Sequence, residues 1–272
     1  MLELLVEMFS LKAMVRAGVA GLMVSLCAAV LGVCLVLKRY SMIGDGLSHV
    51  GFGALAIASA LQLAPMAVTL PVVVVSAFLL LRLSSRGKLK GDALIAMIST
   101  GALAIGIIAI SLSNGTTSDI KSYLFGSILT TSEGDMWLSV GLTVVVLSLF
   151  AIFYRKIFSV TFDETFARAT GEKVERYNML LAFLTALTIV LGMRVMGAML
   201  ISSLVVFPAL TAMRVCKSYK NVMLCALAVS VVCFFTGLCF SYILEIPTGA
   251  SVVVTNILAF LVFWGIGKVR KA

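Results

Sequence analysis

Charged residues are scarce in this sequence. Asp, Glu, Lys and Arg make up 12% of its 272 residues, and 61% are hydrophobic. Soluble globular proteins usually carry about 25% charged residues. A mean hydropathy of +1.15 points the same way. This composition excludes a soluble globular domain and predicts an all-α polytopic membrane protein in contact with membrane lipid.

Acidic residues are the rarer of the two charged kinds, at 12 against 21 basic residues, which gives a formal net charge of +9. A positive charge can indicate nucleic-acid binding. Here, however, the basic residues stand in short gaps between apolar runs, where such residues orient membrane spans. They form no continuous basic face, so nucleic acid is not an expected partner.

Several catalytic and nucleotide-binding motifs are missing. The sequence contains no GxxxxGK[ST] phosphate loop and no HExxH zinc motif, and it has one histidine. The glycines of residues 51–56 imitate a dinucleotide fingerprint, but no strand precedes them. The six cysteines lie in or beside apolar runs without CxxC spacing, as small core residues do. We therefore expect no catalytic residues, no permanently bound cofactor and no enzyme activity in this chain.

Apolar runs near the roughly 20 residues needed to cross a membrane recur along the whole chain. We count nine, which favours nine transmembrane helices. The least secure pair lies between residues 178 and 215, because only residues 192–197 separate its members; one long broken helix there would leave eight. The nine runs are residues 11–37, 45–63, 65–83, 93–113, 136–154, 178–191, 195–215, 222–244 and 250–267.

Lysine and arginine collect in alternate gaps between these runs. With nine spans, all the basic clusters fall on one side, which the positive-inside rule makes the cytoplasm. The N-terminus then lies outside and the C-terminus inside. The opposite gaps, at residues 62–64, 114–135 and 245–249, hold Lys121 as their one basic residue. The cytoplasmic clusters are residues 38–39, 82–90, 155–156, 173–176, 217–220 and 268–271.

Asp45 and His49 are the most informative residues of the sequence. His49 is the sole histidine, and Asp45 precedes it by four positions at the start of an apolar run. A helix of 3.6 residues per turn places both side chains on one face. A carboxylate and an imidazole together bind divalent transition metals, and ionisable groups at membrane depth usually have a function. The alternative is that Asp45 caps a helix and His49 packs against a neighbour.

Two ligands from one chain hold a metal ion poorly, because zinc prefers four protein ligands in a closed site. A two-fold homodimer that brings two copies of this helix face together would supply two carboxylates and two imidazoles. Symmetric dimers are the commonest oligomers. The ligand count therefore predicts a homodimer whose metal site is shared across the dimer axis.

Two gaps are longer than a turn requires. Residues 118–129 are amphipathic and too short to cross, which predicts a helix that lies at the outer membrane surface or dips into a mouth. Residues 161–176 form the most polar stretch of the chain. This stretch opens with Thr161-x-x-Glu164, a capping-box pattern, and Gly171 fits a helix stop. It is either a docking element for a soluble partner or a solvated connection.

Small residues and a proline mark the run at residues 195–215. Pro208 removes a backbone hydrogen bond and is expected to kink its helix. Ser202 and Ser203 are small polar residues that permit close helix contact in lipid. We group Gly197 with them as a packing residue.

Five pieces of the sequence, in this order, resemble the membrane permease subunits of the bacterial zinc/manganese ABC importers, the ABC-3 metal permease family. The resemblance covers essentially the whole length and implies a single transmembrane permease domain over residues 1–272. It also implies a fold similar to the vitamin B12 and siderophore importer permeases. The pieces are residues 38–49, 122–126, 163–171, 195–212 and 247–251.

The family resemblance implies a set of partners. Two separate ABC ATPase subunits would dock beneath a homodimeric permease in the bacterial plasma membrane, and an extracytoplasmic solute-binding protein would deliver the metal. The cargo would be zinc or manganese, or iron. An ATP-independent carrier or channel for divalent cations is the alternative.

The resemblance also assigns roles to residues. Asp45 and His49 match the translocation-path ligands of the family, and residues 163–171 match its ATPase-coupling loop, through Asp163, Glu164, Ala167 and Gly171. The family often has Ala or Thr where Gly46 stands here, and we expect the glycine to loosen the helix start. The positive-inside rule places Asp45 near the cytoplasmic end of its span, so a path ligand there would need residues 38–44 to dip into the membrane.

Overall fold

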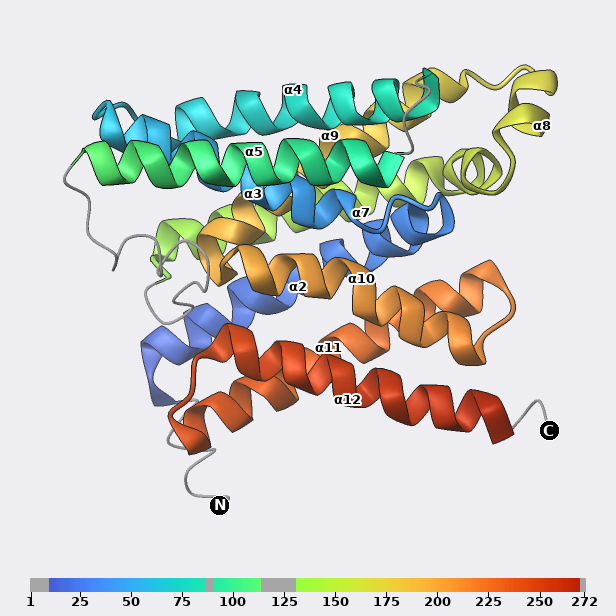
Figure 1. Cartoon of the computed structure of the whole chain (residues 1–272). Helices are drawn as coiled ribbons and strands as arrows, with labels where there is room; N and C mark the ends of the chain where they lie inside the picture. The colour runs from blue at the N-terminus through green and yellow to red at the C-terminus, as the bar shows by residue number, and fades with distance from the viewer. Residues whose placement is uncertain (1–9, 87–90, 114–130, 270–272) are drawn as a thin grey trace.

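The computed structural model describes residues 10–86, 91–113 and 131–269, and the segment 118–129 predicted to lie at the outer surface falls outside them. The described part is helical, with no strand (Figure 1). Its helices are α2 (Lys12–Leu37), α3 (Ile43–Ala60), α4 (Pro65–Arg86), α5 (Gly91–Leu112), α7 (Glu133–Phe162), α8 (Glu164–Ala169), α9 (Val174–Met196), α10 (Ala198–Val215), α11 (Tyr219–Leu244) and α12 (Thr248–Val269).

Eight of the described helices are long and apolar enough to cross a membrane. The remaining long one is α3, whose 18 residues include the polar Asp45, Ser48 and His49. The expected all-helical fold with eight to nine spans is confirmed. The run at 178–215 forms two separate helices, α9 and α10, so the single broken helix is wrong. Helix α7 extends beyond the predicted residues 136–154 at both ends. Ser132 and Asp135 form a capping box at its start, and Ile157 and Val160 are buried in its last turns.

The long helices run back and forth between two ends of the molecule (Figure 1). One end gathers the α2–α3 turn, α8, the α10–α11 turn and the C-terminal end of α12. The opposite end gathers the α3–α4, α9–α10 and α11–α12 turns and the start of α2. The basic residues at 38–39, 217–220 and 268 therefore lie at one end of the described chain. Arg194 is at the other end, where it pairs with Asp135 at 3.0 Å.

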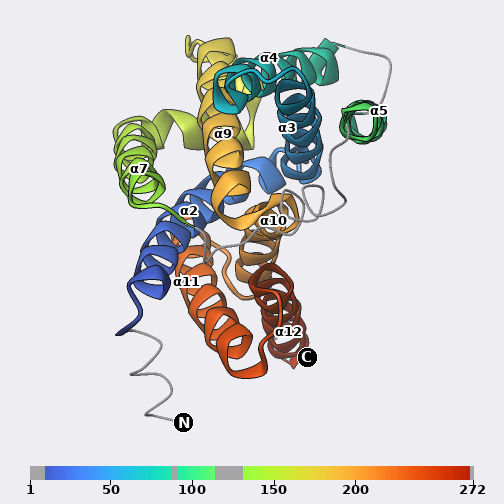
Figure 2. The same ribbon diagram turned by 90° about the vertical axis from the view of Figure 1, so that its left-hand side faces the viewer.

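Helix α2 lies in the middle of the bundle. It packs against α7, α9, α10 and α11, whereas α5 lies at the periphery beside α3 (Figure 2). Gly32 shows how close the central contact is. A Cβ atom there would lie 1.9 Å from the backbone oxygen of Val205 on α10, so glycine is required at this crossing.

A single residue, Gly197, connects α9 and α10. Its φ of 87° lies in the region that favours glycine. The Gly197 N–H donates to the oxygen of Met193 at 2.8 Å, and the Gly197 oxygen accepts from the N–H of Ile201 at 3.3 Å. Gly197 therefore acts through its backbone conformation. The sequence analysis grouped it with the packing residues Ser202 and Ser203 and did not predict this role. Pro208 is buried inside α10, which continues through it.

Candidate functional site

A tight turn joins α2 to α3. The Lys38 N–H donates to the oxygen of Cys34 at 3.0 Å and the Tyr40 N–H to the oxygen of Leu35 at 2.8 Å, while Arg39 adopts a left-handed φ of 63°. These features define a Schellman-type helix end. Residues 38–42 form this tight turn, and α3 begins at Ile43 directly after it.

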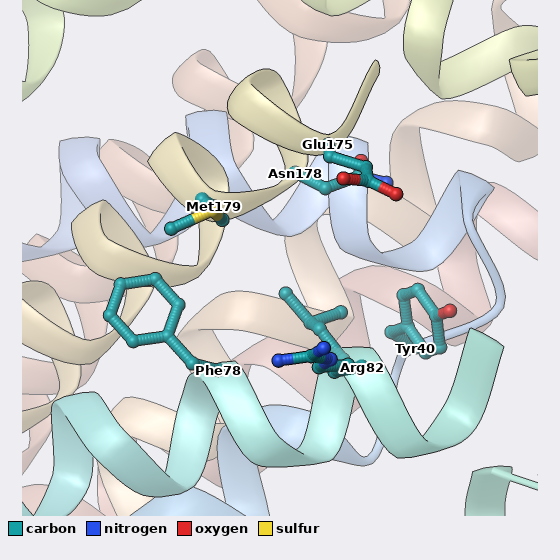
Figure 3. Close-up of a pocket in the computed structure, with 7 residues that line it drawn as sticks. Tyr40, Phe78, Arg82, Glu175, Asn178 and Met179 are labelled. Carbon is teal, nitrogen blue, oxygen red and sulfur yellow. The ribbon is translucent and has the colours of Figure 1, made fainter. Parts of the chain in front are cut away.

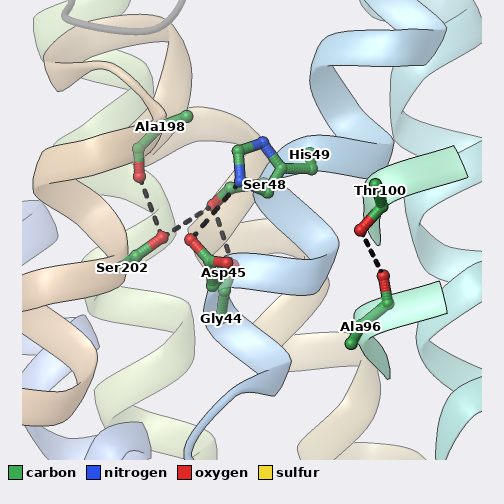
Figure 4. A network of polar contacts seen from close by, with 8 residues as sticks. All are labelled: Gly44, Asp45, Ser48, His49, Ala96, Thr100, Ala198 and Ser202. Carbon is green, nitrogen blue, oxygen red and sulfur yellow. Dashed lines mark hydrogen bonds and ion pairs between the residues drawn. The ribbon is translucent and has the colours of Figure 1, made fainter. Parts of the chain in front are cut away.

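Asp45 and His49 lie one above the other on α3, as their spacing predicts. His49 Nε2 is 3.6 Å from Asp45 Oδ1, and the two side chains are 23% and 46% exposed, respectively (Figure 4). The residue that caps α3 is Met42, so Asp45 is not the cap. His49 Nδ1 is buried and has no hydrogen-bond partner among the described residues. The pair thus offers a carboxylate and an imidazole to a common ligand.

Hydroxyl groups from two helices surround this pair. Ser202 on α10 donates to Ser48 Oγ at 3.3 Å and to the oxygen of Ala198 at 2.9 Å, and Ser48 in turn donates to the oxygen of Gly44 at 2.8 Å (Figure 4). Sequence reasoning assigned Ser202 to helix packing and missed Ser48, although Ser48 directly precedes His49. The neighbouring Ser203 donates to the oxygen of Leu200 instead.

Gly46 creates room for a neighbouring helix. A Cβ atom at this position would lie 2.6 Å from Cγ2 of Ile95 on α5. Helix α3 is regular from Ile43 onwards, so the expectation that Gly46 loosens its start is wrong. The missing side chain lets α5 pack closely on the helix that carries Asp45 and His49.

Within the described residues, no group of three or more His, Cys, Asp or Glu side chains is placed to hold a metal ion. The described part of one chain therefore supplies a pair of such ligands, not a closed set. Ser48 and Ser202 add neutral oxygen atoms beside the pair.

The predicted coupling segment contains a short helix, α8. Asp163 caps it by accepting a hydrogen bond from the N–H of Phe166 at 2.9 Å. The capping box predicted at Thr161 is wrong, because α7 continues through Thr161 to Phe162 and the chain leaves helical geometry at Asp163. Gly171 has a φ of 84° and follows the end of α8, which confirms the predicted helix stop.

The side chains of α8 differ sharply in their exposure to solvent. Ala167 is fully buried against Val160 and Val174, and it anchors the helix to α7 and α9. Phe166 is 62% exposed, and Phe162, four residues earlier, is 59% exposed. A large exposed aromatic at the polar end of a membrane protein is typical of an interaction surface. Sequence reasoning missed Phe166, since its exposure depends on how α8 folds back.

Glu164 turns inward from α8 to form a three-membered network with Lys38 and Asn178. Lys38 Nζ lies 2.6 Å from Glu164 Oε1 and 2.7 Å from Asn178 Oδ1, and Asn178 Nδ2 donates to Glu164 Oε1 at 3.0 Å. Burial opposes ionisation of Glu164, but the hydrogen bonds from Lys38 and Asn178 and the charges of Lys38 and Arg168 together hold its pKa below the ordinary value. Glu164 is thus a carboxylate that links α8 to the α2–α3 turn.

A cavity of about 290 Å³ opens beside this network. Figure 3 shows Arg82 of α4 on one side of it and Glu175 and Asn178 of α9 on the other, with Tyr40 of the α2–α3 turn at one edge. The cavity therefore adjoins both the coupling segment and the turn that leads to Asp45. Its lining residues are Tyr40, Phe78, Leu81, Arg82, Glu175, Asn178 and Met179.

Comparison with known proteins agrees with this architecture. The family model described as "ABC 3 transport family" matches residues 10–266. The chain belongs to the ABC 3 transport family. The resemblance to metal ABC permeases seen in the sequence motifs is thereby confirmed, and the chain is a multi-pass membrane protein of the permease type.

Members of the ABC 3 transport family with similar sequences are named as metal permeases. The chain is 29% identical to the manganese import system permease protein ScaB of Streptococcus gordonii, over 94% of this chain and 92% of that one. It is also 29% identical to the high-affinity zinc uptake system membrane protein ZnuB of Haemophilus influenzae, over 90% and 94%. A solved structure of PsaBC from Streptococcus pneumoniae in complex with Fab superimposes with a TM-score of 0.85, at 27% identity and over 96% and 94% of the two chains.

Proposed function

We propose that this protein is the membrane permease subunit of an ATP-driven importer of divalent transition metal ions, with zinc or manganese as cargo and iron as a further candidate. The observation that carries the proposal is the Asp45–His49 pair on α3, with 3.6 Å between Oδ1 and Nε2. Relatives named as manganese and zinc permeases support the class of cargo. Carboxylate plus imidazole ligation suits zinc, manganese and iron alike.

The pair serves as a transient site for the ion. The Asp45 carboxylate supplies charge and an oxygen ligand, and neutral His49 supplies a nitrogen lone pair. Both side chains are partly exposed, so an ion can enter and leave without unfolding the helix. A transporter must release what it binds, and two ligands per chain bind more weakly than a closed structural site. The permease itself breaks no covalent bond.

A homodimer completes the ligand set. Two copies of α3 facing each other across a two-fold axis bring two carboxylates and two imidazoles to one path. The basic residues at 38–39, 217–220 and 268 share one end of the described chain, which supports a cytoplasmic C-terminus and an outer N-terminus. Residues 1–272 act in this assembly as a single permease domain in the plasma membrane.

Separate ABC ATPase subunits hydrolyse the ATP. They dock at the end of the molecule that carries α8, where Phe166 presents an exposed aromatic ring, and the coupling residues Asp163, Glu164, Ala167 and Gly171 build and anchor that helix. An extracytoplasmic solute-binding protein delivers the ion at the opposite end. Movement of α8 then alternates the access of the Asp45–His49 pair to the two sides of the membrane.

Uptake by the reconstituted assembly tests this function. Permease and ATPase subunits in liposomes, with the binding protein outside, should accumulate zinc or manganese when ATP is present. Asp45→Ala and His49→Ala should abolish uptake, while Thr236→Ala on α11, whose hydroxyl bonds within its own helix to Val232, should not change it. Competition among metal ions in the same assay identifies the cargo. Rapid metal flux through the purified chain alone would instead support the ATP-independent carrier.

A further inference from the structure

Lys38 holds three segments of the chain together. It is the first residue after α2, and its ammonium group bonds Glu164 of α8 and Asn178 of α9 at 2.6 and 2.7 Å. Its side chain is only 6% exposed. The Glu164 side chain is 42% exposed, so solvent screens that side of the pair, while the Lys38 ammonium group is held away from water. The three side chains form a closed triangle, because Asn178 also donates to Glu164. We call them the Lys38 triangle.

The turn that follows Lys38 is short and held by backbone hydrogen bonds. The Lys38, Arg39 and Tyr40 N–H groups all bond to the last turn of α2, and the Tyr40 oxygen accepts from the N–H of Ile43, the first residue of α3. Asp45 lies in the first turn of α3. The Lys38–Glu164 bond, the backbone of residues 38–43 and the bond from the Ile43 N–H to the Tyr40 oxygen therefore connect α8 to the start of the helix that carries Asp45 and His49.

Helix α8 has few other attachments. It contains six residues, and its buried contact with the rest of the protein is the small side chain of Ala167 against Val160 and Val174. Glu164 is thus its main polar link to the transmembrane bundle among the described residues. Among the described residues, the bond from Lys38 to Glu164 is the polar contact of α8 that reaches the α2–α3 turn.

We propose that Lys38 is a positioning residue that couples movement of α8 to the Asp45–His49 pair. When a docked ATPase displaces α8, Glu164 draws Lys38 and the α2–α3 turn with it, and this changes how the Asp45–His49 face of α3 meets Ser202 on α10. The inference rests on the proposed function, since it assigns a role within the same transport cycle. It concerns how ATP hydrolysis is converted into metal movement and not whether the metal binds.

A second ion pair at the same end provides a matched control. Lys156 Nζ of α7 lies 3.3 Å from Glu172 Oε2, just after α8, and the two side chains are 49% and 28% exposed. This pair also ties the coupling segment to a membrane helix, but it has no bond to the α2–α3 turn. Loss of Lys156 therefore removes a cytoplasmic ion pair without cutting the proposed connection to α3.

The test compares Lys38→Met with Lys156→Met in the full permease–ATPase complex in liposomes. The readouts are metal ions imported per ATP hydrolysed, the ATPase rate itself and recovery of the ATPase subunits with the permease. We expect Lys38→Met to keep its ATPase subunits and to hydrolyse ATP, while the imported metal per ATP falls about tenfold or more. Lys156→Met should keep the wild-type ratio. A purely structural role would lower assembly and leave the ratio of the assembled complex unchanged.

Two further variants keep the inference testable if Lys38→Met does not fold. Glu164→Gln preserves the shape of the side chain and one hydrogen bond. It should therefore lower the metal imported per ATP less than Lys38→Met does. The charge swap Lys38→Glu with Glu164→Lys should restore part of the ratio, because the Asn178 amide can donate to a carboxylate or accept from an ammonium. The inference would be overturned if the charge swap did not raise the metal imported per ATP and Glu164→Gln kept the wild-type value.

The outcomes separate this inference from the proposed function. Absence of ATP-dependent uptake by the wild-type complex would overturn the proposed function and the inference with it. Normal wild-type uptake with an unchanged ratio in Lys38→Met, or with equal losses in Lys38→Met and Lys156→Met, would overturn the inference alone.

Discussion

Ser202 of α10 donates a hydrogen bond to Ser48 of α3, with 3.3 Å between the two oxygen atoms, directly beside the Asp45–His49 pair (Figure 4). The two serines are 154 positions apart in the sequence, so this contact joins distant parts of the chain. Ser48 also directly precedes His49, so the contact sets where α10 lies relative to the imidazole. Small polar residues are suited to this role because they let helices approach closely in lipid.

Replacing Ser202 by alanine should therefore weaken metal transport. Ser202→Ala removes the link to Ser48, and we expect the metal concentration for half-maximal uptake to rise about fivefold, the equivalent of one hydrogen bond of about 1 kcal/mol. Thr236→Ala is the control, because it loses the same kind of bond to its own helix but no bond to another helix. Equal uptake curves for the two variants would show that the contact does not position the site.

The proposed shared site would make transport depend on both copies of His49. A linked dimer with His49→Ala in one half should lose most of its uptake, because one imidazole is missing from the common ligand set. The control is the same linked dimer with two wild-type halves. Uptake by the mixed dimer at the wild-type rate, or at half of it, would show that each chain works alone and that the site is not shared.

Metal uptake should fall in acid, because protons compete with the metal ion for the ligands of the Asp45–His49 pair. Protonated imidazole has no free lone pair, so His49 binds metal only in its neutral form. Glu164 does not account for such a loss. Its pKa is held below the ordinary value of 4.5, so its ion pair with Lys38 is present above that value and is lost only as the pH falls through the lowered pKa. ATPase activity measured in parallel controls for damage to the partner subunits, and uptake that does not change on acidification while ATPase activity is intact would contradict metal binding by the Asp45–His49 pair.

Phe166 should be a major contact for the ATPase subunits. Its ring is 62% exposed on α8, and burying an aromatic side chain at the centre of an interface typically contributes about 2 kcal/mol or more. Phe166→Ala is expected to weaken binding of the purified ATPase by roughly thirtyfold, that is, by about 2 kcal/mol. Phe240→Ala on α11 removes a ring that is 49% exposed and lies toward the opposite end of the molecule, and it should leave binding unchanged.

Gly197→Ala should destabilise the protein. The backbone of Gly197 has a φ of 87°, and a side chain in such a conformation costs about 1–3 kcal/mol. Gly141→Ala provides the comparison, since Gly141 lies inside α7 with nothing within 4 Å of an added Cβ atom. Thermal unfolding in detergent should show a lower midpoint for Gly197→Ala and an equal or higher one for Gly141→Ala. A Gly197→Ala midpoint equal to that of the wild type would refute the strain argument.

The sequence was most informative where the relevant physics is local. Helical periodicity alone predicted that Asp45 and His49 share a face, and apolar run lengths predicted most of the long helices. The capping box at Thr161 was mispredicted because the packing of α7 carries that helix past the polar residue. Local patterns also cannot reveal that Lys38 meets Glu164, since the two residues are 126 positions apart and meet only when α8 folds back onto the bundle.

The crossing of α2 and α10 at Gly32 has a consequence for the transport cycle. Backbone meets backbone there, with no layer of side chains between the helices that could tilt or change rotamer. These two helices must then shift as one rigid body. Helices α3 and α5 form a second such pair, because a Cβ atom on Gly53 would lie 2.6 Å from the backbone oxygen of Ala102. The opening and closing of the pathway therefore falls to the contact between α3 and α10, which runs over side chains such as those of Ser48 and Ser202.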